Sequence, residues 1–114
     1  MSDTCIFCKI RDGDVSGDIL YRDEHCFVIR DIAPSAPTHL LVIPRQHITS
    51  VPTGNPKEEA LLGHLLTVAE QMARREQVRQ SGYRLVINQG RDAGQGVDHL
   101  HLHVLGGKPL PPLG

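Results

Sequence analysis

Three histidines alternate with apolar residues near the end of the chain, at His99, His101 and His103. Side chains alternate between the two faces of a β-strand, so a strand over 99–105 places all three imidazoles on one face. Successive imidazoles are then spaced by about 6.5–7 Å, twice the rise per residue. This spacing allows several of them to surround one phosphoryl group. The pattern therefore predicts a phosphate-handling site.

Imidazole is well suited to attack at phosphorus. Its ordinary pKa of about 6.5 leaves it mostly neutral and nucleophilic at neutral pH. A neutral nucleophile also avoids the repulsion that a carboxylate meets from a phosphate. A phosphorylated imidazole is labile, so water can complete the reaction through a covalent histidine–phosphate intermediate. Chelation of a transition metal by the alternating histidines is the competing interpretation.

A glycine-rich loop comes directly before the histidine segment, with Gly90, Gly94 and Gly96. Glycines let backbone N–H groups approach a ligand closely and form an anion-binding concavity. Taken alone, such a loop is a weak signal, because the glycines could simply form a turn. Its junction with the three histidines strengthens the prediction of a phosphate site.

A second group of potential ligands is the C-x-x-C motif of Cys5 and Cys8. With Cys26 the chain has three cysteines, an odd number that cannot all pair within one chain. This favours a metal site or free thiols over a disulfide framework. Two cysteines at this spacing form half of a tetrahedral zinc site and need two further ligands. Cys26 lies among apolar residues and is expected in the core.

Apolar periodicity indicates the strands that must position these groups. Residues 40–43 form a continuous apolar run closed by Pro44, which is typical of a strand buried on both faces. Gly106 and Gly107 are expected to stop the histidine strand. Strands arranged around one long helix make the predicted fold class α+β. The other strands are expected over 19–22, 26–30 and 85–87.

One long helix is marked at both ends. Asn55 is the expected N-cap, Pro56 the first helical residue, and Glu58 the acidic member of a capping box. The segment 74–80 is polar, and Gly82 is the expected stop. Two adjoining apolar stripes are more than one sheet face needs, which leaves one available for a subunit contact. The stripes consist of Leu61, Leu65, Val68 and Met72, and beside them Leu62, Leu66, Ala69 and Ala73.

Length and composition limit the class of protein. The 114 residues, without repeat or linker, suit a single domain over 1–114. A formal charge of −1 lacks the basic field that binding of a nucleic-acid polymer requires, so any phosphate must be bound by local donors. The sequence shows no membrane-spanning apolar run and no signal-peptide pattern, so we expect no membrane contact and a cytoplasmic location.

The histidine segment completes the motif His-φ-His-φ-His-φ-φ, in which φ is apolar, over residues 99–105. On this motif the chain resembles the histidine-triad (HIT) family. Residues 5–10, 31–39, 41–44 and His47 are similar to the family in order and spacing, so the resemblance covers nearly the whole chain. Gly106-Gly107 resembles the Hint branch of purine nucleoside phosphoramidases, whereas the Fhit-like dinucleotide hydrolases tend to carry Pro-Arg there.

The resemblance implies a HIT fold, an antiparallel sheet of about five strands with one long helix and a short N-terminal helix. It implies a homodimer in which the two sheets form one continuous sheet. It also implies a hydrolase that cleaves nucleoside 5′-phosphoramidates, or related substrates such as aminoacyl-adenylates, to a purine nucleoside monophosphate. Two alternatives stay open: a Fhit-like hydrolase of dinucleoside polyphosphates, and a nucleotide-binding regulatory protein with incidental hydrolysis.

Residue roles follow from the resemblance position by position. His101 matches the nucleophile, and the main-chain carbonyl of His99 would fix its tautomer. His103 would bind the phosphate, with His39 supporting the triad. Asp31 matches the residue that holds the ribose hydroxyls, although by itself it could be a turn residue. The implied nucleotide pocket also includes Ile6, Phe7, Ile10, Val15, Ile32, Asn88, Gly94, Gln95, Gly96 and Val97.

Several prokaryotic members of the family bind zinc through two cysteines and two histidines. The matching positions here are Cys5, Cys8, His47 and His99. The resemblance therefore implies a structural zinc ion that would anchor the N-terminal segment beside the histidine segment and orient His99. Two free thiols in a reducing cytoplasm are the alternative.

The chain departs from the family at a few positions. Gly96 stands where many Hint proteins carry a serine whose hydroxyl is thought to help the leaving group. Asp98 replaces an aromatic or apolar residue. Ile29 and Arg30 lie near the base pocket, which leaves base preference open, and the C-terminal tail lacks the tryptophan of some animal relatives.

Overall fold

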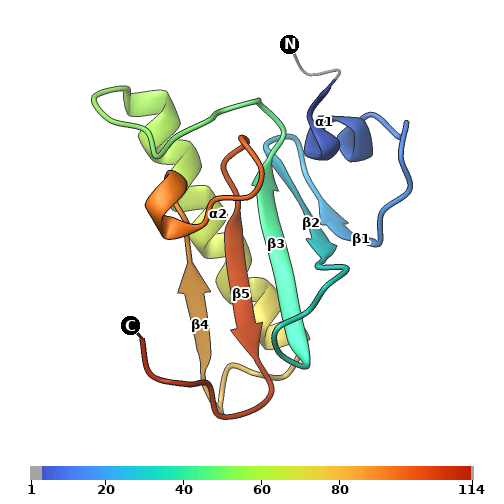
Figure 1. Cartoon of the computed structure of the whole chain (residues 1–114), viewed down its shortest axis with the longest axis vertical. Coiled ribbons are helices and arrows are strands. Elements are labelled where there is room, and N and C mark those ends of the chain that lie inside the picture. The colour runs from blue at the N-terminus through green and yellow to red at the C-terminus, as the bar shows by residue number, and fades with distance from the viewer. Residues whose placement is uncertain (1–3, 114) are drawn as a thin grey trace.

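The computed structural model describes residues 4–113 and contains a five-stranded antiparallel sheet with helices on both sides (Figure 1). The order across the sheet is β1-β2-β3-β5-β4, so β3 is central and β1 and β4 are the edges. The expected α+β architecture, with a short first helix and one long helix, is confirmed. The elements are α1 (Ile6–Arg11), β1 (Ile19–Arg22), β2 (Cys26–Arg30), β3 (Thr38–Pro44), α2 (Pro56–Arg75), β4 (Tyr83–Val86), η2 (Arg91–Ala93) and β5 (Leu102–Gly106).

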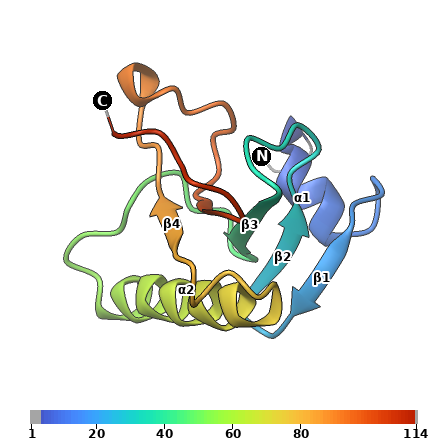
Figure 2. The ribbon, with the colours of Figure 1, turned by 90° about the horizontal axis from the view of Figure 1, so that it is seen from below.

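The sheet separates two apolar cores. Helix α2 lies along one face and α1 covers part of the other (Figure 2). Strand β3 supplies both cores, with Leu40 and Val42 on the α2 side and Leu41 and Ile43 on the α1 side. All seven of its residues are buried, which confirms the strand predicted over 40–43 and extends it at both ends. Cys26 is fully buried in the α2 core, as expected.

The last strand was expected to begin at His99, but it begins at Leu102. In the register of β3 and β5, Leu100 would lie opposite Pro44, which has no N–H to donate. The carbonyl of Pro44 is also occupied, because it accepts from His99 Nε2 at 2.9 Å. The N–H of Leu100 bonds instead to the carbonyl of Ile48, at 2.6 Å. Residues 99–101 therefore lie outside the ladder.

The predicted alternation of faces nevertheless holds through this segment. Leu100, Leu102 and Val104 are buried in the core against α2. On the opposite side, the ring of Phe7 in α1 packs edge-on against His99 and His101. The histidine segment thus presents apolar side chains to α2 and imidazoles to α1.

Helix α2 begins where the sequence indicates. The side chain of Asn55 accepts hydrogen bonds from the N–H groups of Lys57 and Glu58, at 3.1 and 3.2 Å. Pro56 is the first helical residue. The returning contact of the predicted capping box is made by Glu59 instead of Glu58, since its carboxylate accepts from Gly54 N–H at 2.9 Å. The start of the helix is therefore firmly capped.

The expected helix end at Gly82 was wrong, since α2 ends at Arg75. Gln77 adopts a left-handed conformation with φ of 63°. Its N–H bonds to the carbonyl of Arg74, and that of Val78 bonds to the carbonyl of Ala73, which is the Schellman arrangement. Val78 is then buried in the core, and this burial favours the early stop over a longer polar helix.

The two apolar stripes of α2 share the core. Leu65, Val68 and Met72 of the first stripe are buried, and so are Ala69 and Ala73 of the second. Leu66 is 43% exposed, which leaves part of the second stripe uncovered.

In the part of the chain that the structure describes, neither helix has the length and hydropathy needed to cross a membrane.

Candidate active site

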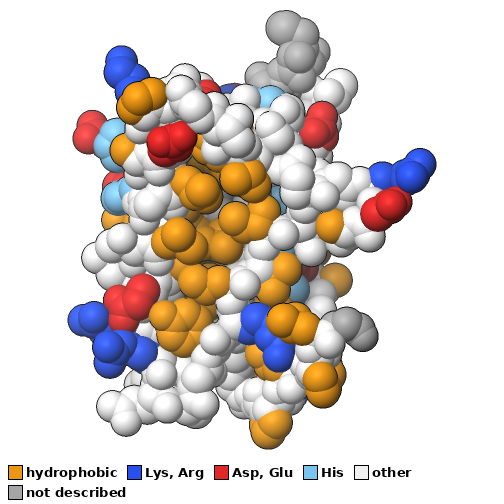
Figure 3. Space-filling view, turned by 90° about the vertical axis from the view of Figure 1, so that its left-hand side faces the viewer, with side chains coloured by type: hydrophobic (Ala, Val, Ile, Leu, Met, Phe, Trp, Pro, Cys, Tyr) orange, Lys and Arg blue, Asp and Glu red, His pale blue; other side chains and the backbone are white. Residues whose placement is uncertain are grey.

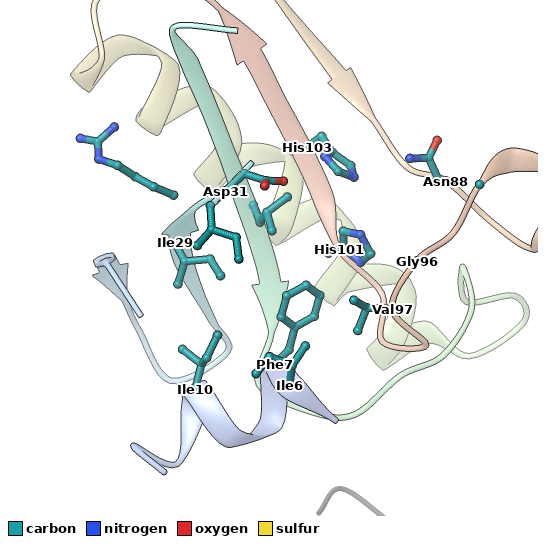
Figure 4. A pocket seen from close by; sticks show the side chains of 14 residues that line it. Ile6, Phe7, Ile10, Ile29, Asp31, Asn88, Gly96, Val97, His101 and His103 are labelled. Atoms are coloured by element: carbon teal, nitrogen blue, oxygen red, sulfur yellow. The ribbon is translucent and has the colours of Figure 1, made fainter. Parts of the chain in front are cut away.

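A cavity of about 380 Å³ opens between α1, the sheet and the glycine-rich loop (Figure 4). At one end lie apolar side chains from α1 and β2, including Ile10 and Ile29. At the other end lie His101, His103 and Asn88. The lining residues are Ile6, Phe7, Ile10, Ile29, Arg30, Asp31, Ile32, Leu41, Asn88, Gly94, Gly96, Val97, His101 and His103. Such a cavity can hold a flat apolar ring at one end and an anion at the other.

Most of the residues expected in the nucleotide pocket line this cavity, but Val15 and Gln95 do not. Val15 is exposed in the turn after α1. The Gln95 amide instead braces the glycine-rich loop, since its oxygen accepts from Gly90 N–H at 2.8 Å and its nitrogen donates to the Val97 carbonyl at 3.1 Å. The sequence interpretation missed Leu41, which the period of a strand places on the same face of β3 as His39.

The tautomer of His101 follows from its hydrogen bond. Its Nδ1 lies 2.7 Å from the main-chain carbonyl of His99. A carbonyl oxygen can only accept, so Nδ1 carries a proton, and in the neutral ring Nε2 keeps a lone pair. Phe7 packs edge-on against this imidazole, with ring centroids 5.1 Å apart, and holds its orientation. The neutral His101 ring therefore presents Nε2, in a fixed orientation, as a potential nucleophile.

A chain of hydrogen bonds also fixes the tautomer of His103. The N–H of Ser35 donates to His39 Nδ1 at 2.9 Å, so the proton of His39 is on Nε2. That N–H donates to His103 Nδ1 at 2.9 Å and lies 3.4 Å from an Asp31 carboxylate oxygen. The proton of His103 must then be on Nε2. This nitrogen is buried without a hydrogen-bond partner among residues 4–113, so it is an unused donor on a side chain that lines the cavity.

The pKa values of His103 and His39 agree with this series of hydrogen bonds. Burial, together with the neighbouring His101 and His39, lowers the pKa of His103 to about 4, against the opposing effect of Asp31. Burial also lowers the pKa of His39, against the opposing effect of Asp31. Both rings are thus neutral at pH 7 and carry one proton each, as the hydrogen bonds require. His101 and His103 lie close together, with ring centroids 5.0 Å apart.

His99 does not line this cavity and joins the cysteine pair instead. Its Nε2–H donates to the Pro44 carbonyl, so its Nδ1 keeps the lone pair. That nitrogen lies 3.3 Å from Cys5 Sγ and 3.6 Å from Cys8 Sγ. His47 Nδ1 lies 3.2 Å from Cys8 Sγ. The four potential ligand atoms all lie within 4.8 Å of one another.

This donor set fits a zinc ion. Zinc bonds of about 2.3 Å to sulfur and about 2.0–2.1 Å to nitrogen place tetrahedral ligand atoms roughly 3.3–3.8 Å apart. The sulfur–nitrogen distances here, 3.2–3.6 Å, nearly match that range. Burial raises the pKa of Cys8, so a bound ion would have to displace its proton. The cluster can hold a metal ion that joins α1 to the histidine segment.

Comparison with known proteins shows the family to which the chain belongs. The family model of the HIT domain matches residues 12–110. The chain belongs to the HIT family. Purine nucleoside phosphoramidase of Escherichia coli (strain K12) is 42% identical over 113 residues, which cover 99% of this chain and 95% of that protein.

HIT family hydrolases of known structure share the whole fold. The one from Clostridium thermocellum superposes with a TM-score of 0.92 at 40% identity, covering 97% of this chain and 96% of that one. The one from Legionella pneumophila gives 0.89 at 41% identity, covering 94% and 96%. This HIT protein is therefore an enzyme of the nucleotide-hydrolase type. Of its three motif histidines, the last two line the cavity and the first contributes a carbonyl to the site and a ring nitrogen to the cysteine cluster.

Proposed function

We propose that this HIT protein hydrolyses purine nucleoside 5′-phosphoramidates, or related nucleotidyl substrates such as aminoacyl-adenylates, through a nucleotidyl group on His101. One observation carries the proposal: two imidazoles line the same cavity, His101 with a lone pair on Nε2 and His103 with an unused N–H on its buried Nε2. The name of the Escherichia coli relative supports a phosphoramidate as the substrate class.

The reaction proceeds by two displacements at phosphorus. His101 Nε2 attacks, a P–N bond forms to the imidazole, and the P–N bond to the leaving amine breaks as that amine takes a proton from water. The His99 carbonyl accepts from Nδ1–H and stabilises the positive charge that the ring acquires. His103 Nε2–H donates to a phosphate oxygen. Water then attacks phosphorus, releasing the nucleoside monophosphate, a proton and free His101.

The cavity orients the nucleotide. Its apolar end, between Phe7 and Ile29, suits a purine ring, and Asp31 lies between that end and the histidines. One Asp31 oxygen accepts from Ala33 N–H at 2.9 Å, and the carboxylate has capacity left to accept from ribose hydroxyls. Asn88 and the glycine-rich loop supply polar groups at the phosphate end. The attacked phosphorus then lies beside His101.

Turnover of adenosine 5′-phosphoramidate tests this function. We expect hydrolysis to AMP by the wild type and loss of turnover in His101→Ala, with AMP binding largely kept. Normal activity of His101→Ala would contradict the mechanism. A higher kcat/KM for a dinucleoside polyphosphate would favour the Fhit-like alternative, and AMP binding without turnover of either substrate would favour a regulatory role.

We also propose a structural zinc ion on Cys5, Cys8, His47 and His99. The proposal is supported by the converging lone pairs and by the buried, unpaired cysteines. A cytoplasmic location suits it, because that compartment keeps thiols reduced. Metal analysis of the purified protein should give one zinc per chain, lost in Cys8→Ala. Full zinc content in that variant would refute the ligand set.

A homodimer joined through β4 is the third part of the proposal. Strand β4 is an edge of the sheet, and an uncovered edge strand is a template for pairing. The side of the molecule on which β4 lies carries a broad apolar surface (Figure 3). Leu66 is 43% exposed, and Leu62, Tyr83 and Leu85 are only partly buried. Light scattering should give a dimer, and Leu66→Glu should shift it toward monomer; a monomeric wild type would refute it.

A further inference from the structure

A second cavity, of about 620 Å³, adjoins the nucleotide cavity. It lies between the start of α1, the loop after β3 and the glycine-rich loop, which contribute Thr4, Thr49 and Asp98 respectively. Ile6, Gly96 and Val97 line both cavities. A substrate that fills the first cavity can therefore extend into the second across these shared residues.

The second cavity lies on the side where a leaving group is expected. In Figure 4, Ile10 and Ile29 are on one side of His101, and Gly96 is on the other. A nucleotide with its base against Ile10 and Ile29 and its phosphorus at His101 therefore directs its remaining phosphate substituent toward Gly96. A Cβ atom at Gly96 would meet nothing within 4 Å, so this residue borders open space. The passage between the cavities has room for a substituent.

The second cavity has an unneutralised negative charge. Asp98 is exposed and takes part in none of the salt bridges found among residues 4–113. Arg91 lines a neighbouring hollow with it, but this guanidinium is paired with Asp92 at 3.0 Å. No lysine or arginine lines the second cavity among the described residues. Cys5 and His47, two of the proposed zinc ligands, also line this cavity. Two thiolates balance the charge of a bound zinc ion, so Asp98 is the one net charge that a cationic group meets among the described lining residues.

We propose that the second cavity is the leaving-group subsite and that Asp98 there favours amines carrying an additional cationic group, such as aminoalkyl or lysine-type amines. This inference rests on the proposed phosphoramidase function and names the substrate class within it. An ion pair at an exposed site contributes modestly, so we expect a preference of roughly two- to fivefold in kcat/KM. The preference should weaken as salt screens the pair.

The test compares two adenosine phosphoramidates of equal length, one with a pentyl amine and one with an aminobutyl amine. The wild type should prefer the aminobutyl substrate two- to fivefold at low salt. In Asp98→Asn this ratio should fall to about one, because the aminobutyl substrate loses its partner. Asp14→Asn removes an exposed carboxylate that lines neither cavity and belongs to none of the salt bridges among residues 4–113, and it should keep the wild-type ratio.

Each contrary result has a distinct meaning. A wild type that hydrolyses both substrates equally, or an Asp98→Asn protein that keeps the preference, overturns the inference and leaves the proposed function standing. An equal fall for both substrates in Asp98→Asn also overturns it, since that result indicates a structural role for Asp98. A wild type that hydrolyses neither substrate refutes the proposed function and the inference together.

Discussion

The buried N–H of His103 should be worth one to two orders of magnitude in catalysis. A charge-assisted hydrogen bond from this donor to a phosphate oxygen contributes about 1.5–3 kcal/mol. At about 1.4 kcal/mol per factor of ten, His103→Ala should therefore lower kcat/KM for adenosine 5′-phosphoramidate by roughly ten- to hundredfold. His39, which loses its acceptor in this variant, keeps the Asp31 carboxylate nearby at 3.4 Å. We thus expect the rest of the site to hold.

A matched variant separates the donor from the packing. In His103→Gln the side-chain amide nitrogen can reach the position of Nε2, so this variant should recover part of the rate lost in His103→Ala. Steady-state kinetics and AMP binding by calorimetry measure the effect, and thermal melts check that both variants fold. The reasoning is refuted if folded His103→Ala stays within threefold of wild type, or if His103→Gln is no better than His103→Ala.

Three further predictions concern stability. Burial lowers the pKa of His103 from 6.5 to about 4, so between pH 6.5 and pH 4 the unfolded chain binds more protons than the folded chain. The stability that neutral His103 contributes is therefore fully present above pH 6.5 and is lost as the pH falls toward 4. As the pH is lowered from 6.5 to 4, the unfolding free energy of wild type should fall relative to that of His103→Gln by at most about 3 kcal/mol. A difference that does not change with pH would contradict this prediction. Asn55→Ala removes the cap of α2 and should cost about 1 kcal/mol in denaturant unfolding, with no loss counting against the cap. Gln77→Gly relieves the strain of a left-handed backbone and should raise the unfolding free energy by about 0.5–1 kcal/mol in denaturant unfolding. A lower unfolding free energy would show that the contribution of the glutamine side chain exceeds the backbone strain.

The sequence predicted correctly those structural features that depend on residues close together in the chain. The strict alternation around His101 gave the correct faces although the segment is not a strand, because extended backbone alternates with or without a ladder. The run 40–43 became the central buried strand. Asn55 and Pro56 fixed the start of α2, since capping depends on residues close in sequence. These features need no knowledge of distant contacts.

Features set by long-range contacts could not be read in the same way. The late start of β5 depends on the register between β3 and β5, which brings Leu100 opposite Pro44 from 56 positions away in the sequence. The early end of α2 depends on burial of Val78 against the sheet. The second cavity needs three segments that only the fold brings together, so the sequence could mark Asp98 as unusual without indicating what it faces.

Trapping the covalent intermediate tests the central claim most directly. Wild-type protein quenched within milliseconds of mixing with adenosine 5′-phosphoramidate, then digested and analysed by mass spectrometry, should yield an adenylylated peptide with the modification on His101. An adenylyl group on another histidine, or full turnover of substrate without any adenylylated peptide at any quench time, would contradict the account.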